Sequence, residues 1–148
     1  MLKPGNIAPV FSLEAHDGTT WRLEAMRGRK VLIWFYIEAG TPGCALEGRG
    51  FNDHRSYFDE LGIALAGISF DTVEDNAAFA RKFGFTCPLL SDREHQVALA
   101  YGACDDSNAR YPARISFLIN EEGVVSRIYD QVDPRDHPAR VLADLMPE

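Results

Sequence analysis

The feature that most constrains the fold of this chain is one apolar run followed almost at once by a helix-start signal. Residues 31–37 read VLIWFYI, a stretch of branched and aromatic apolar side chains without polar alternation. Such a run is typical of a central strand that is covered on both faces. Thr41 and Pro42 follow, and threonine favours the N-cap position while proline fits the first helical position. We therefore expect a buried strand that leads into a helix extending to about Leu61.

The rest of the chain repeats this alternation of strand and helix. The pattern predicts strands at 63–70 and near 88–90, and helices at about 73–83, 94–101 and 138–145. Strands joined by helices indicate βαβ units with parallel pairing. Two hairpins are predicted around the turn signals HDG at 16–18 and EEG at 121–123. The chain is thus expected to form an α/β fold, with a central mixed β-sheet flanked by helices and an N-terminal β-hairpin.

Length and charge narrow the class of protein. A chain of 148 residues is long enough for a core of its own, and no repeat or linker interrupts it, so we expect one domain spanning 1–148. The net charge of −7 repels phosphate backbones and argues against a nucleic-acid partner. The sequence shows no apolar run of signal-peptide or membrane-spanning length. We therefore expect a cytoplasmic protein without membrane contact.

The reactive side chains of greatest interest are three cysteines, Cys44, Cys87 and Cys104, which form no CxxC pair. Cys44 falls at the third position of the predicted helix, where unpaired backbone amides and the helix dipole favour the anionic thiolate. Most lone cysteines are inert core residues. However, the junction between a strand's carboxyl end and a helix's amino end is where open α/β sheets place their ligands. We predict that Cys44 is a thiolate nucleophile.

The segment FYIEAGTPGCALEGRGFND at 35–53, with LLSD at 89–92 and RISFLI at 114–119, resembles the peroxiredoxin superfamily of AhpC/TSA-like thiol peroxidases. The similarity is greatest to the bacterioferritin comigratory protein or PrxQ branch and covers nearly the whole chain. It implies a thioredoxin-like fold and the reduction of hydrogen peroxide and organic hydroperoxides. Carried over by position, the peroxidatic cysteine falls on Cys44, and its usual helpers fall on Thr41, Glu47 and Arg114.

The mechanism that this resemblance implies begins with attack of the Cys44 thiolate on the distal peroxide oxygen, which gives a sulfenic acid and releases water or an alcohol. Arg114 would hold the thiolate and the developing negative charge, and the Thr41 hydroxyl would orient the peroxide. Simpler roles stay open for the helpers. Thr41 could be only a helix cap, Glu47 only a favourable charge near the helix start, and Arg114 only a solvated charge at a strand end. Tyr36 could line the pocket or be a core residue.

The chain departs from the family pattern at three positions. Ile37 stands where the family has a proline seven residues before the peroxidatic cysteine. The two usual places for a resolving cysteine hold Arg49 and Ala80. Cys104, beside the polar segment 105–108, and Cys87, at a strand start, are the remaining possible resolving residues. We expect instead a one-cysteine cycle, in which a small-molecule thiol or a thioredoxin-like protein reduces the sulfenic acid.

Two glycines, Gly48 and Gly50, weaken the first turns of the predicted helix, because each costs about 1 kcal/mol relative to alanine. This predicts a helix start that unwinds easily and lets oxidised Cys44 reach a reductant.

Other functions are less well supported by the sequence. A thiol–disulfide oxidoreductase would need the missing CxxC pair. A non-enzymatic redox sensor or client-binding protein, oxidised at Cys44, is the alternative to the enzyme. No metal or other cofactor is expected, because the histidines do not share ligand spacing with the cysteines and no glycine-rich phosphate loop occurs. These four histidines are interpreted as surface or packing residues: His16, His54, His95 and His137. Whether the protein is a monomer or a homodimer is left open.

Overall fold

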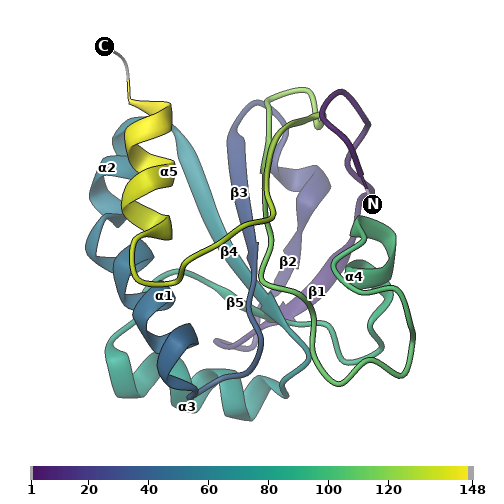
Figure 1. The fold of residues 1–148 in the computed structure, drawn as a ribbon, viewed down its shortest axis with the longest axis vertical. Helices are drawn as coiled ribbons and strands as arrows, with labels where there is room; N and C mark the ends of the chain where they lie inside the picture. The colour runs from purple at the N-terminus through teal and green to yellow at the C-terminus, as the bar shows by residue number, and fades with distance from the viewer. Residues whose placement is uncertain (1, 147–148) are drawn as a thin grey trace.

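A computed structural model describes residues 2–146 of the chain, which fold around one seven-stranded sheet (Figure 1). The strands are β1 (Ser12–Ala15), β2 (Thr20–Arg22), β3 (Lys30–Phe35), β4 (Ile63–Ser69), β5 (Leu89–Ser91), β6 (Ser116–Ile119) and β7 (Val125–Tyr129). The helices are α1 (Pro42–Asp53), α2 (Arg55–Glu60), α3 (Val73–Phe83), α4 (Gln96–Tyr101) and α5 (His137–Leu145), with a 3₁₀ turn at Leu23–Met26. Among these residues, none of the helices combines the length and apolar character needed to cross a membrane.

The strand order in the sheet is β2-β1-β5-β4-β3-β6-β7. The three central strands β3, β4 and β5 are parallel, because α1 with α2 and then α3 carry the chain back between them. The outer strands pair antiparallel: β1 with β5 and β2, and β6 with β3 and β7. The expected mixed sheet, its βαβ units and both hairpins are confirmed.

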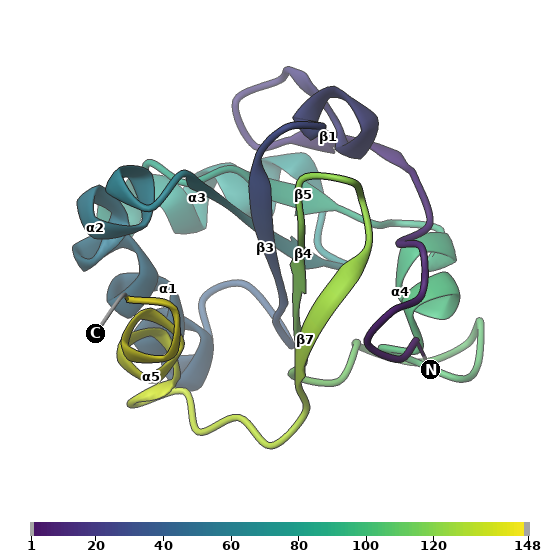
Figure 2. The ribbon, with the colours of Figure 1, turned by 90° about the horizontal axis from the view of Figure 1, so that it is seen from above.

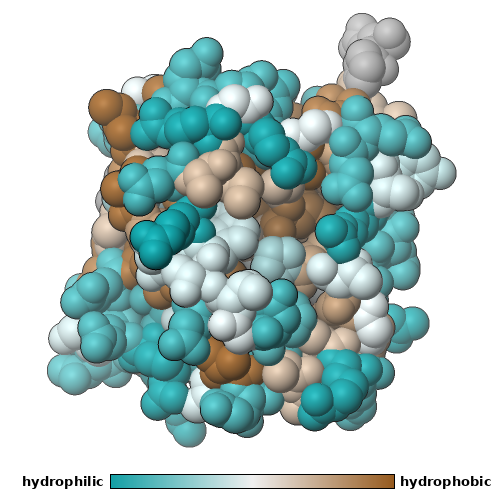
Figure 3. Space-filling view, turned by 180° about the vertical axis from the view of Figure 1, so that it is seen from behind, coloured by the Kyte–Doolittle hydropathy of each residue, from teal (hydrophilic) through white to brown (hydrophobic). Residues whose placement is uncertain are grey.

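Two apolar cores cover the two faces of the sheet. Alternate residues of β3 enter each core, so that Val31, Ile33 and Phe35 face one side while Leu32 and Trp34 face the other. Helix α4 covers the first face, and α1, α2, α3 and α5 cover the second (Figure 2). The apolar run at 31–37 is therefore the centre of both cores. The face of the molecule drawn in Figure 3 carries scattered apolar patches among hydrophilic side chains.

The structure differs from the expected elements mainly at the helix after β3. The expected single helix to about Leu61 is interrupted at His54, whose backbone angles of φ −100° and ψ 6° leave the helical region and separate α1 from α2. Strand β3 ends at Phe35, earlier than expected, although the Tyr36 amide still donates to the Ile68 carbonyl. The 3₁₀ turn after β2 was not expected from the sequence.

Candidate active site

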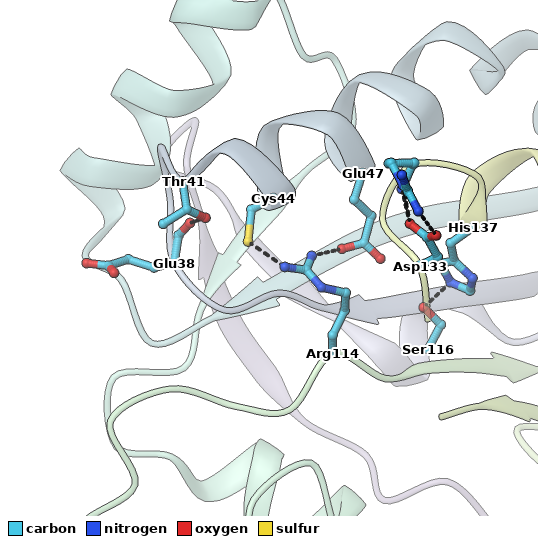
Figure 4. Close-up of polar contacts among 9 residues, drawn as sticks. Glu38, Thr41, Cys44, Glu47, Arg114, Ser116, Asp133 and His137 are labelled. Carbon is cyan, nitrogen blue, oxygen red and sulfur yellow. Dashed lines mark hydrogen bonds and ion pairs between the residues drawn. The ribbon is translucent and has the colours of Figure 1, made fainter. Parts of the chain in front are cut away.

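Cys44 lies where the strand-to-helix junction places it, in the first turn of α1. Thr41 is the N-cap residue with extended backbone angles, Pro42 is the first helical residue and Cys44 the third. The thiol is completely buried in the core on the α1 side of the sheet, in the same cluster as Trp34 and Tyr36. Figure 4 shows its sulfur pointing toward the guanidinium of Arg114.

Arg114 joins Cys44 to Glu47 through the two ends of its guanidinium group. Its Nη2 lies 3.5 Å from Cys44 Sγ, and its Nη1 donates to Glu47 Oε1 at 2.6 Å (Figure 4). Glu47 lies one turn after Cys44 on α1 and is fully buried. Arg114 approaches from the segment just before β6, which pairs with β3. The structure thus brings together three of the predicted site residues from two distant parts of the sequence.

The charges in this cluster are unbalanced, because one guanidinium faces two acidic groups. Burial raises the pKa of Glu47 from 4.5 to about 7, although Arg114 opposes the shift. Burial alone would lower the pKa of Arg114, yet the nearby Glu47 and Cys44 raise it above its usual value. The other oxygen of Glu47, Oε2, is buried and has no hydrogen-bond partner among the described residues. Arg114 thus places its positive charge between Cys44 and the buried carboxyl of Glu47.

Gly43 gives Arg114 the room to reach the thiol. A Cβ atom at Gly43 would lie 3.2 Å from Arg114 Nη2 and 3.7 Å from the Pro134 side chain. Such a contact is tighter than ordinary packing, so a side chain there would push the guanidinium away. The glycine between Pro42 and Cys44 thus belongs to the site, a role that was not recognised from the sequence.

Thr41 does not cap α1 with its side chain. Its hydroxyl donates to the Glu38 carbonyl at 2.8 Å, within the loop that connects β3 to α1. The same loop is attached to the end of β4, because Asp71 Oδ2 accepts from the Ala39 amide at 2.8 Å and from Ser69 Oγ at 2.7 Å. Asp71 is a positioning residue of this loop that was not recognised from the sequence.

Tyr36, which precedes this loop, is completely buried, as expected for a core residue. Its hydroxyl donates to Asn76 Oδ1, and Asn76 Nδ2 donates to Ser91 Oγ at 3.2 Å. This polar network satisfies buried groups beneath the β3–α1 loop and does not present the Tyr36 hydroxyl to solvent.

A buried histidine stands on the far side of Glu47 and Arg114 in Figure 4. His137, at the start of α5, has Nε2 at 2.8 Å from Ser116 Oγ, and its ring packs edge-on against Phe51 and Tyr129. Burial lowers the pKa of His137 from 6.5 to about 4, and Arg114 lowers it further while Asp136 opposes the shift. The expectation that this residue serves packing agrees with its burial, but its hydrogen bond to Ser116 was not foreseen.

The other two cysteines lie in different surroundings. Cys87 is buried in the same core as Cys44, where burial raises its pKa to about 11, whereas Cys104 is half-buried against the core on the opposite face. Burial also raises the pKa of Cys104. All three cysteines are free thiols. Arg49 is exposed on α1 and Ala80 is buried on α3, so the usual resolving positions offer no thiol.

Ile37, in place of the family's proline, faces a hollow beside the β3–α1 loop. The hollow has a volume of about 370 Å³ and is lined by Ile37, Glu38, Phe70, Asp71, Arg110 and Tyr111. Within residues 2–146, no group of three or more histidine, cysteine or acidic side chains is arranged to hold a metal ion.

A buried thiol at a helix start, held by an arginine beside a mixed α/β sheet, defines a cysteine-dependent redox protein. Comparisons with known proteins make this class specific. The family model of the AhpC/TSA family matches residues 4–128. The chain is 36% identical over 149 residues to a putative peroxiredoxin bcp of Coxiella burnetii, covering 97% of this chain and 99% of that protein. It is 36% identical to the peroxiredoxin Bcp of Escherichia coli, covering 95% and 94%.

Solved structures agree with this assignment. Peroxidoxin BcpB from Mycobacterium tuberculosis superposes with a TM-score of 0.89 at 31% identity, covering 98% of this chain and 97% of that one. The bacterioferritin comigratory protein of Xanthomonas campestris gives 0.85 at 31% identity, covering 91% and 89%. The chain belongs to the AhpC/TSA family, in its Bcp/PrxQ branch. It has the thioredoxin-like fold of these peroxiredoxins and is a thiol peroxidase.

Proposed function

We propose that Cys44 is the peroxidatic cysteine and that Arg114 and Glu47 position and stabilise its thiolate, with Thr41 orienting the peroxide. The observation that carries this proposal is the guanidinium of Arg114, which contacts both Cys44 Sγ at 3.5 Å and Glu47 Oε1 at 2.6 Å. A planar guanidinium presents several N–H donors in a fixed fork, so it can donate to the thiolate sulfur and to a carboxyl oxygen at once. We also propose that residues 1–148 act as one domain, because α1 and the segment before β6, which supply this site, are both attached to one continuous sheet.

In the proposed reaction the Cys44 thiolate attacks the distal oxygen of the hydroperoxide. The sulfur–oxygen bond forms while the oxygen–oxygen bond breaks, and the electron pair leaves with the other oxygen, which takes a proton and departs as water or an alcohol. Cys44 becomes a neutral sulfenic acid. Arg114 stabilises the negative charge as it moves from sulfur to the departing oxygen. Hydrogen peroxide and organic hydroperoxides both fit this step, and the bacterioferritin comigratory protein of Xanthomonas campestris is described as having alkyl peroxide reduction activity.

Return of Cys44 to the thiolate is proposed to need an external thiol. One reducing thiol condenses with the sulfenic acid to a mixed disulfide and water, and a second thiol releases Cys44 and forms the reductant disulfide. Burial raises the pKa of Cys87 to about 11, which favours its unreactive thiol form. Cys104 packs against the opposite core from Cys44. A thioredoxin-like protein or a small thiol in a reducing compartment such as the cytoplasm is the proposed reductant.

Intact-mass measurement after one equivalent of hydrogen peroxide tests both steps. The wild type and the Cys87→Ser and Cys104→Ser variants are expected to gain roughly 16 Da, the mass of a sulfenic oxygen, and Cys44→Ser is expected to gain none. A loss of roughly 2 Da in the wild type, absent from one serine variant, would replace the one-cysteine cycle by an internal disulfide through that residue. An unchanged wild-type mass would overturn the assignment of Cys44.

A further inference from the structure

A second hollow lies outside the Cys44 site, between the N-terminal hairpin and two helices. This cleft has a volume of about 750 Å³ and runs along residues 9–14, the start of α3 at 72–74 and the segment 91–101 that contains α4. Cys44, Glu47 and Arg114 do not line it. Its volume falls in the usual range of about 300–1,000 Å³ for ligand sites.

One wall of the cleft is the edge of β1 where its partner strand has ended. Strands β1 and β5 pair only at Glu14 with Ser91 and at Ala15 with Leu90. After Ser91 the chain turns away, and the Asp92 amide donates to the Ser69 carbonyl of β4. The residues of β1 that precede Glu14, Ser12 and Leu13, therefore have no neighbouring strand on this side. A strand edge without a partner presents backbone donors and acceptors at fixed spacing.

The hydrogen-bond alternation shows which residues of β1 face this gap. The Ala15 amide donates to the Thr19 carbonyl, on the β2 side of β1. The His16 amide instead donates to the Leu89 carbonyl of β5. In an antiparallel strand, alternate residues bond to opposite neighbours, so even-numbered residues face β5. The backbone N–H and C=O of Ser12 consequently point into the cleft. They are placed to pair with an added strand that would continue the line of β5.

The two sides of the cleft differ in chemistry, because α4 covers one face of the sheet and α3 the other. On the α4 side the lining includes the apolar side chains of Phe11, Leu13, Val97 and Tyr101. Asp92, Arg93 and Glu94, just before α4, also line the cleft, and Arg93 is the one basic residue among four acidic ones there. On the α3 side the lining carries the exposed carboxylates of Glu14 and Glu74. The side chains of a strand alternate between faces. A strand lying beside β1 would therefore meet apolar groups and carboxylates in turn.

We propose that this cleft binds an extended peptide segment of another protein, which adds to β1 as a strand and carries alternating apolar and basic side chains. The main-chain groups of Ser12 supply the pairing, the apolar wall accepts every second side chain, and Glu14 and Glu74 attract the lysines or arginines between them. A second copy of this chain is a poor occupant, because its net charge is −7. The site is independent of the peroxidase reaction and needs no oxidation of Cys44.

The test uses the reduced full-length protein and a short acetylated, amidated peptide in which lysine alternates with valine. Binding is measured by calorimetry and by the exchange of backbone amides in a nitrogen-15 spectrum. The Ser12 amide is expected to exchange freely in the free protein and to become protected in the complex. A peptide with glutamate in place of lysine, and one with the same lysines and valines in two blocks, are expected to bind at least tenfold more weakly.

A matched pair of variants separates this site from general attraction between a basic peptide and an acidic protein. Glu14→Lys with Glu74→Lys is expected to weaken binding at least tenfold, while Glu121→Lys with Glu122→Lys, the same charge change on the exposed β6–β7 turn, leaves most of it. Both pairs are exposed, so folding should be preserved. Equal loss in both pairs, equal binding of the block peptide, or binding without protection of the Ser12 amide would each overturn the proposal. Peroxidase activity serves only as a folding control.

Discussion

Arg114 is the side chain on which the reactivity of Cys44 is expected to depend most. We predict that Arg114→Lys slows the oxidation of Cys44 by at least about tenfold, because an ammonium group is a single point of charge and cannot contact Cys44 and Glu47 in the fixed fork of a guanidinium. Stopped-flow measurement of Cys44 oxidation by hydrogen peroxide, followed by the fluorescence of the nearby Trp34, gives the rate.

The control is Arg140→Lys, the same substitution at an exposed arginine of α5 that forms an ion pair with Asp136. This variant is expected to react like the wild type, since exposed ion pairs contribute little. If Arg114→Lys reacts as fast as Arg140→Lys, the two-sided contact of the guanidinium is not what activates the thiol.

Individual residues could be predicted from the sequence only where they belong to a local signal or to the family motif. Cys44 followed from the helix start at Thr41 and Pro42, and the family pattern indicated Glu47 and Arg114. Residues that act through long-range contacts carried no such signal. Asp71, just after β4, accepts from the Ala39 amide in the loop after the neighbouring strand β3, and a histidine that bonds Ser116 looks in the sequence like any other.

At the scale of the helix, the glycines of α1 have a packing role that changes how they can be tested. A Cβ at Gly48 would lie 2.7 Å from the Phe85 ring, and one at Gly50 would lie 2.7 Å from the Pro138 ring. The idea that these glycines let α1 unwind stays a prediction. Exchange to alanine cannot test it, because the added methyl groups would disturb the contacts of α1 with the core and with α5.

We predict that Gly48→Ala lowers the free energy of unfolding by about 1–3 kcal/mol, the usual cost of overpacking, despite the higher helix propensity of alanine. Adding Phe85→Leu removes the ring that the new methyl group meets and is expected to lessen the cost of the first change. Urea unfolding of both single variants and the double variant measures the coupling. Additive effects would show that the Phe85 contact does not explain the need for glycine.

Elements were predictable where periodicity and turn residues agreed, as in α3, which begins at a Thr72 cap and ends at Gly84. The interruption between α1 and α2 at His54 was not predicted, because no glycine or proline stands at the break and the weak helix formers Asn52, Asp53 and His54 are not by themselves a stop signal. Short strands such as β5 were found, but their exact ends depend on pairing partners that lie far away in the chain.

At the scale of the whole molecule, the sheet order decides what the sequence could not show. Arg114 meets Cys44 because β6 pairs with β3. The cleft beside β1 exists because β5 ends opposite Glu14, whereas β1 already begins at Ser12. Local patterns indicated that these strands exist and that the centre is parallel. Which antiparallel strand lies at which edge depends on the packing of both cores together.

Two buried groups with opposite pKa shifts make the stability of the folded protein depend on pH. The pKa of Glu47 rises from 4.5 to about 7 on folding, so its protonated form stabilises the fold below pH 4.5, and this contribution is lost as the pH rises toward 7. The pKa of His137 falls from 6.5 to about 4, so its neutral form stabilises the fold above pH 6.5, and this contribution is lost as the pH falls toward 4. Between these limits the two effects oppose each other.

In a variant that lacks one of these two groups, the pH dependence of stability should reveal the effect of the other. We predict that Glu47→Gln gains stability relative to the wild type as the pH rises from 4.5 to 7, by on the order of 3 kcal/mol, because it no longer has a carboxylate to ionise in the core. His137→Gln should gain relative stability in the opposite direction, as the pH falls from 6.5 toward 4. Urea unfolding at several pH values measures the free energy of unfolding of each variant relative to the wild type. The contributions of the other titratable groups, which the proteins share, cancel in this difference. Profiles parallel to the wild type would show that neither group changes its pKa on folding, and the unbalanced charge around Arg114 would then need another explanation.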